Sequence, residues 1–116
     1  MERLFALFEE MGYKNAEGFF RQGSLTDETY PPEFFTFWNI DTPQDRHYDN
    51  KLTRYNEYVQ VGFYTDNAIK IYSVMEDFIE RARSKGFVIA GLPRDANADK
   101  KGYFGRVCYI RIIHNI

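Results

Sequence analysis

The stretch from Leu52 to Tyr64 reads LTRYNEYVQVGFY and is the clearest strand pattern in the chain. Successive side chains of a strand point to opposite faces, so this stretch divides into two sets. One set is Glu57, Val59, Val61 and Phe63, and the other is Tyr58, Gln60, Gly62 and Tyr64. Because both valines and the phenylalanine belong to the first set, we expect that set to face the hydrophobic core.

A helix is predicted directly after this strand. Thr65, Asp66 and Asn67 supply side chains typical of a helix N-cap, and the helix is expected to run to about Lys85. Gly86 is placed to end it in a left-handed cap. The expected buried stripe recurs at three- and four-residue spacing and comprises Ile71, Val74, Met75, Phe78, Ile79 and Ala82.

Three elements are predicted upstream of Leu52. Apolar residues at three- and four-residue spacing predict a helix over residues 2–11, ended by Gly12. Residues 14–21 are predicted as a short strand. The aromatic run EFFTFWNI, residues 33–40, predicts a strand that follows two adjacent prolines.

Three segments follow the second helix. Residues 87–92 predict a short apolar strand, and residues 93–102 predict a polar connection rich in turn-forming residues. The last strand is predicted from Tyr103 to His114, with apolar residues on both faces. Such a strand is typical of the centre of a sheet or of a surface covered by a neighbouring subunit.

The predicted order of elements is therefore α-β-β-β-α-β-β, which places the chain in the α+β class. The economical arrangement is a mostly antiparallel sheet with two helices packed on it. A length of 116 residues is usual for one domain, and neither a repeat nor a linker divides residues 1–116. We therefore expect a single domain.

Composition adds an excess of aromatic residues and an uneven charge. The chain has 11 Phe, 9 Tyr and 1 Trp, and such side chains dominate protein interfaces as well as cores. The formal net charge is −2, but residues 1–58 carry 6 basic and 11 acidic side chains, whereas residues 59–116 carry 9 and 6. This asymmetry favours head-to-tail contacts between copies. A chance scatter of surface charges is the alternative explanation, and we give it more weight.

The candidate chemical groups do not predict catalysis. His47 lies near Asp41, Asp45 and Asp49 in the polar loop of residues 41–51, and we favour a solvated loop over a metal site. Cys108, the single cysteine, is expected to be a small core residue. No phosphate-binding, nucleophile-elbow or zinc-protease motif is present. We therefore expect no enzymatic activity, no metal and no cofactor.

Two further expectations concern membranes and nucleic acid. The N-terminal residues resemble no signal peptide and no stretch is apolar enough for a membrane span, so a cytoplasmic protein is expected. Nucleic-acid binding is a rival function, although the negative net charge makes nucleic acid an unexpected partner. Its candidate contacts would be Phe34, Phe35, Phe37 and Trp38 for base stacking, with Arg54, Arg106 and Arg111 for phosphates.

The order of parts carries one more signal. A short helix ends in Met11-Gly12-Tyr13, and the strand at residues 58–66 reads YVQVGFYTD. Between them lie the pair Phe19-Phe20, the pair Pro31-Pro32 before the aromatic strand, and Tyr48-Asp49-Asn50-Lys51 at the end of the polar loop. This pattern resembles the small tail terminator, tail completion or head–tail joining proteins of long-tailed phages and prophages of Gram-positive bacteria.

The resemblance implies a non-catalytic virion protein. Such a protein forms a ring, usually a hexamer of itself, that caps the tail tube and docks to the head connector protein. It would reside in the host cytoplasm during assembly and then in the virion tail. The candidate assembly interface comprises Asp45, Arg46, His47, Tyr48, Tyr58, Tyr64, Arg106 and Tyr109. A head-closure adaptor and a small nucleic-acid-binding regulatory domain remain as alternatives.

Overall fold

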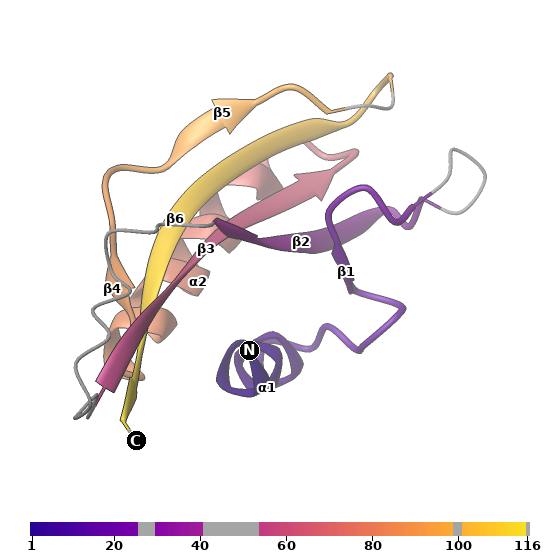
Figure 1. Ribbon diagram of the computed structural model, residues 1–116. Helices are drawn as coiled ribbons and strands as arrows, with labels where there is room; N and C mark the ends of the chain where they lie inside the picture. The colour runs from indigo at the N-terminus through magenta and orange to yellow at the C-terminus, as the bar shows by residue number, and fades with distance from the viewer. Residues whose placement is uncertain (26–29, 41–53, 99–100, 116) are drawn as a thin grey trace.

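A computed structural model describes residues 1–25, 30–40, 54–98 and 101–115 of the chain (Figure 1). It has two helices and six strands. In chain order these are α1 (Glu2–Glu10), β1 (Phe19–Arg21), β2 (Glu33–Ile40), β3 (Arg54–Thr65), α2 (Lys70–Ser84), β4 (Val88–Ile89), β5 (Arg94–Ala96) and β6 (Phe104–Asn115). The prediction of an α+β fold is confirmed, with one strand more than expected.

The six strands form one sheet in the order β1-β2-β3-β6-β4, and β5 also pairs with β6. Only β1 and β2 are parallel, so the predicted mostly antiparallel sheet is confirmed. The longest pairing joins β3 to β6, with Val59 opposite Ile110 and Val61 opposite Cys108. Since β6 lies between β3 and the short edge strands, its apolar character on both faces fits its central position.

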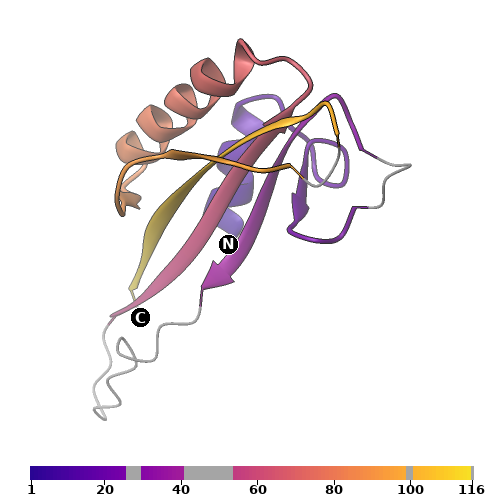
Figure 2. The same ribbon diagram turned by 90° about the horizontal axis from the view of Figure 1, so that it is seen from above.

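The core lies between the sheet and the two helices, which pack on the same face of the sheet (Figure 2). The predicted apolar set of β3 is buried there, together with Phe35 of β2 and alternate residues of β6. The Phe35 ring lies 4.8 Å from Phe8 of α1 and 5.5 Å from Phe78 of α2, measured between centroids. One aromatic cluster therefore joins both helices to the sheet.

The strand predicted at residues 14–21 is wrong for its first half, because only Phe19–Arg21 pairs as β1. The carbonyl of Lys14 accepts hydrogen bonds from the backbone amides of Glu17 and Gly18, at 3.1 and 2.7 Å. Ala16 has a positive φ of 63°. These hydrogen bonds form a turn, which removes the segment from the sheet.

The boundaries predicted after α2 are also wrong. The expected strand of residues 87–92 is reduced to Val88–Ile89, and the expected polar connection contains β5. Gly91 has a φ of 97°, a left-handed conformation that interrupts the edge of the sheet. An edge strand such as β5 is held by backbone pairing to β6, so it needs no apolar pattern.

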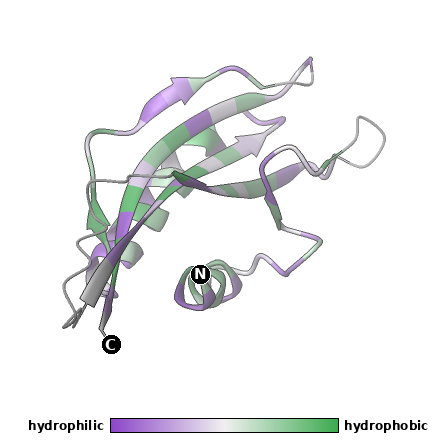
Figure 3. Ribbon diagram, in the orientation of Figure 1, coloured by the Kyte–Doolittle hydropathy of each residue, from purple (hydrophilic) through white to green (hydrophobic). Residues whose placement is uncertain are grey.

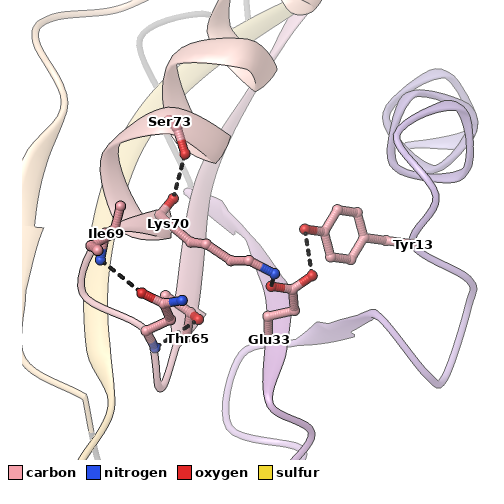
Figure 4. Close-up of polar contacts among 7 residues, drawn as sticks. Tyr13, Glu33, Thr65, Ile69, Lys70 and Ser73 are labelled. Carbon is pink, nitrogen blue, oxygen red and sulfur yellow. Dashed lines mark hydrogen bonds and ion pairs between the residues drawn. The ribbon is translucent and has the colours of Figure 1, made fainter.

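Both predicted helix ends are confirmed, since Gly12 and Gly86 have φ values of 96° and 90°. The start of α2 differs, because the helix begins at Lys70, three residues after the predicted cap. Asn67 nevertheless supplies cap chemistry, as its Oδ1 accepts a hydrogen bond of 3.0 Å from the Ile69 amide. That bond forms the turn that leads into the helix (Figure 4).

Polar contacts link the start of β2 to Tyr13, which follows α1, and to Lys70, the first residue of α2 (Figure 4). The Glu33 carboxylate accepts a hydrogen bond of 3.3 Å from the Tyr13 hydroxyl and one of 3.0 Å from Lys70 Nζ. Burial, followed by the negative charge of Glu33, raises the pKa of Tyr13 well above its usual value. The hydroxyl therefore stays protonated and remains a donor.

Candidate assembly surface

The second face of the sheet carries no helix in the described part of the chain (Figure 2). We call it the open face and define it by the strand side chains that alternate with the core set. Apolar and polar residues mix along its long strands (Figure 3). Its members are Phe20 of β1, Phe34, Thr36, Trp38 and Ile40 of β2, Asn56, Tyr58, Gln60 and Tyr64 of β3, Val107, Tyr109, Arg111 and Ile113 of β6, and Val88, Arg94 and Ala96 at the edge.

No acidic side chain belongs to the open face among the described residues. The strands carry three acids, Glu33, Glu57 and Asp95, and the register places all three on the helix-covered face. Each of these acids has a basic partner there. Lys70 lies 3.0 Å from Glu33, His114 lies 2.9 Å from Glu57, and Arg106 lies 2.7 Å from Asp95.

Two arginines belong to the open face instead. Arg94 donates a hydrogen bond of 2.7 Å to the Tyr109 hydroxyl, and its guanidinium lies 5.4 Å from the centroid of that ring. Arg111 stands directly opposite Tyr58 in the ladder. Its Nε is buried and has no hydrogen-bond partner among the residues that the structure describes. A protein with a net charge of −2 thus presents a locally basic sheet surface.

Partly exposed ring side chains lie beside these arginines on the open face. Trp38 is 45% exposed, and the cross-strand register aligns it with Gln60 and then Tyr109. Tyr58 is half-buried on the neighbouring row, opposite Arg111. Half-exposed aromatic rings next to arginines are typical of the residues that dominate protein interfaces.

Tyr64 lies across the sheet at one end of the open face, because two glycines make room for its ring. A Cβ atom built on Gly105 would lie 2.5 Å from the ring, and one built on Gly62 would lie 2.9 Å from it. The Tyr64 ring stacks on Phe34, with 5.6 Å between centroids and 22° between planes. A cavity of about 210 Å³ adjoins these rings and is lined by Arg21, Gln22, Gly23, Leu25, Tyr30, Phe34, Thr36, Tyr64 and Asn97.

The structure separates the residues expected at an assembly interface. Tyr58, Tyr64 and Tyr109 share the open face. Arg106 belongs to the other face, where it binds Asp95 and lies 4.9 Å from the centroid of the Tyr72 ring. The remaining expected residues, Asp45, Arg46, His47 and Tyr48, lie outside the described residues, as does the loop considered for metal binding.

The aromatic set expected to stack nucleic-acid bases is wrong for two of its four members. Phe35 is fully buried in the core, and Phe37 packs against Phe5 of α1 with 4.9 Å between centroids. Phe34 belongs to the open face but is buried, so Trp38 alone of this set is well exposed. Of the proposed phosphate contacts, Arg111 belongs to the open face and Arg106 does not. The side chain of Arg54 is not among those that the structure describes.

Two features of the open face were not recognised from the sequence. These are the presence of Arg94 and, among the described residues, the lack of acidic side chains. The position of Arg94 depends on the pairing of β5, which the sequence pattern did not predict. The position of the acids could have been predicted in part, because Glu57 and Tyr58 are adjacent in one strand and therefore point to opposite faces. Combining that alternation over neighbouring strands would have placed the carboxylates of the described strands on one face.

The described residues offer little for chemical catalysis. Cys108 is completely buried, and burial raises the pKa of its thiol to about 12. The prediction that it is a core residue is confirmed, and a thiol in this state is a poor nucleophile. Within the described ranges, no group of three or more His, Cys, Asp or Glu side chains is positioned to bind a metal ion.

Comparison with protein-family models finds none that matches the chain, and comparison with curated proteins finds no significant relative. Neither helix of the described structure has the length and apolar character needed to cross a membrane.

Proposed function

We propose that this chain is a non-catalytic virion protein, a tail terminator or tail-to-head joining protein that assembles with copies of itself. The observation that supports this proposal is the contrast between the two sides of the molecule. The open face is aromatic, contains arginines and lacks acids among the described residues, whereas exposed acids occur on the helices of the other side. Head-to-tail rings require two different complementary surfaces on each copy.

The setting in a phage tail rests on the sequence pattern around the prolines and the aromatic strand. That pattern resembles tail terminator and tail completion proteins over nearly the whole chain. The proposed partners are therefore other copies in a ring, the tail tube protein and the head connector protein. The proposed location is the host cytoplasm during assembly and the virion tail afterwards.

The mass of the purified protein in solution tests the proposal. Size-exclusion chromatography with light scattering, over a range of concentrations, is expected to show a discrete oligomer of several copies. The same measurement is repeated after the tail tube protein is added, because a ring can require its tube to assemble. A monomer under every one of these conditions would contradict the proposed function.

Single-stranded nucleic acid is a second candidate partner, because the open face also has the side chains that bind it. Trp38, Tyr58 and Tyr109 could stack bases while Arg94 and Arg111 bind phosphates. Tight binding of single-stranded oligonucleotides that weakens steeply with salt would favour this function. The negative net charge of the chain argues against it.

A further inference from the structure

The outer surface of α2 combines exposed acids with exposed apolar residues. Ile69, Tyr72, Glu76 and Glu80 recur at three- and four-residue spacing, on an exposed side of the helix next to the buried stripe. Ile69 is 84% exposed and Tyr72 is 49% exposed. We call these four residues the outer stripe of α2.

Within the described ranges, the acids of the outer stripe have no hydrogen-bond or ion-pair partner. The ion pairs of α2 and its C-cap join Lys70 to Glu33, Arg81 to Asp77 and Glu10, and Lys85 to Glu10. Among the described residues, Glu76 and Glu80 form no ion pair or hydrogen bond. Lying one helical turn apart, they form a local negative charge between the apolar end of the stripe and the exposed Arg83, which follows Glu80 at three-residue spacing.

The outer stripe is complementary to the open face in both charge and apolar character. Arg94 and Arg111 on the open face are positive, and Arg111 has an unsatisfied buried donor nitrogen in the described structure. The exposed Trp38 can cover apolar residues of the stripe. The exposed surface of α1 fits less well, since none of the large exposed apolar residues of the described structure lies on α1 and its Glu10 is already bound to Arg81 and Lys85.

Building on the proposed function, we propose that the outer stripe of α2 in one copy docks on the open face of the next copy. Glu76 and Glu80 then lie against the positive charge of Arg94 and Arg111, and apolar residues of both surfaces leave water together. The two surfaces are different, so the contact is head-to-tail and can be repeated from copy to copy.

Charge reversal tests both halves of this contact. The variants Glu76→Lys/Glu80→Lys and Arg94→Glu/Arg111→Glu are each expected to raise the concentration for half-assembly at least about tenfold, because like charges then meet. A 1:1 mixture of the two variants should assemble again, since every α2 stripe can find an open face of opposite charge. The control Glu2→Lys/Glu9→Lys makes the same change in charge on exposed residues of α1 and should assemble like the native chain.

Trp38 provides an independent readout because it is the only tryptophan of the chain and belongs to the open face. Its fluorescence emission should shift to shorter wavelength when the native chain assembles, and it should not shift in either charge variant alone. Circular dichroism of each variant confirms that the fold is retained. If Arg111→Glu prevents folding, Arg94→Glu alone replaces the double variant in the same experiments.

The outcomes separate this inference from the function on which it rests. Oligomers that form with all variants, with Trp38 emission unchanged, would overturn the proposed contact and leave self-assembly standing. A native chain that never assembles, alone or with the tube protein, would overturn both. A shift of Trp38 emission caused by a single-stranded oligonucleotide, in a chain that stays monomeric, would assign the open face to nucleic acid instead.

Discussion

The two faces of the sheet are both rich in aromatic rings, yet the partly exposed rings of the open face differ in type from the buried rings of the covered face. On the helix-covered face the buried strand rings are phenylalanines, among them Phe35 and Phe63. On the open face, Tyr58, Tyr109 and Trp38 carry a hydroxyl or an indole N–H. A phenylalanine ring is best placed where nothing polar is required, whereas tyrosine and tryptophan suit surfaces that pass between water and a partner. Aromatic content alone therefore does not distinguish a core from a docking surface.

Charge divides the faces in the same way. Each strand acid of the covered face has a basic partner, so that face is nearly neutral within the described structure. The open face has arginines without matching carboxylates among the described residues. Charges paired inside a fold chiefly contribute to its stability, whereas charges of one sign on a surface favour an external partner of the opposite sign.

The largest expected difference between the faces is in stability. Phe35→Ala removes a fully buried ring that contacts rings from both helices, and we expect it to lower the free energy of unfolding by about 3–5 kcal/mol. Trp38→Ala removes a larger but half-exposed ring, and the loss should be less than about 1 kcal/mol. Urea unfolding, followed by circular dichroism, measures both variants. Equal losses would show that the open face belongs to the core.

A smaller effect is expected from the glycine beneath Tyr64. In Gly105→Ala, the new Cβ would lie 2.5 Å from the Tyr64 ring and 2.8 Å from the carbonyl oxygen of Ala96. Because the backbone carbonyl cannot move as freely as a side chain, we expect a loss of about 1–3 kcal/mol, measured by thermal or urea unfolding. A Tyr64→Leu background removes the ring contact and should reduce that loss. An unchanged stability of Gly105→Ala would mean that the ring does not lie across this position.

The sequence predicted best those elements whose side chains alternate or recur regularly over many residues. The bounds of β2 were predicted correctly, and β3, β6 and α2 were predicted within a few residues, because each buries a continuous apolar stripe. The polar strand β5 was missed since backbone pairing to β6 defines it. Residues 14–17 were wrongly predicted as part of a strand. They form a turn held by hydrogen bonds to the Lys14 carbonyl, and such backbone bonds leave no pattern of apolar residues in the sequence.

The candidate surface was predictable only in part. The shared face of Tyr58 and Tyr64 follows from alternation along one strand. The same rule separates Arg106 from Tyr109, because an offset of three positions along β6 places their side chains on opposite faces, so grouping them was avoidable. The addition of Trp38 and Arg94 to this face required the register of β2 and β5, which depends on contacts between strands distant in sequence.

The smallest expected effect comes from the Glu57 and His114 pair on the covered face, and it is lost in acid. Burial tends to raise the pKa of Glu57, but the hydrogen bond with His114 and the charge of the Met1 amino group outweigh it and hold the pKa below its usual 4.5. A lowered pKa in the folded state stabilises the fold above the unfolded pKa, and this contribution is lost as the pH falls through the folded value. The stability difference between the native chain and Glu57→Gln should therefore shrink as the pH is lowered from 6 toward 3. Glu9→Gln, a change at an exposed acid of α1, should show no such trend. Urea unfolding at a series of pH values measures both, and a difference for Glu57→Gln that stays constant with pH would show that the Glu57 and His114 pair does not stabilise the covered face through its charge.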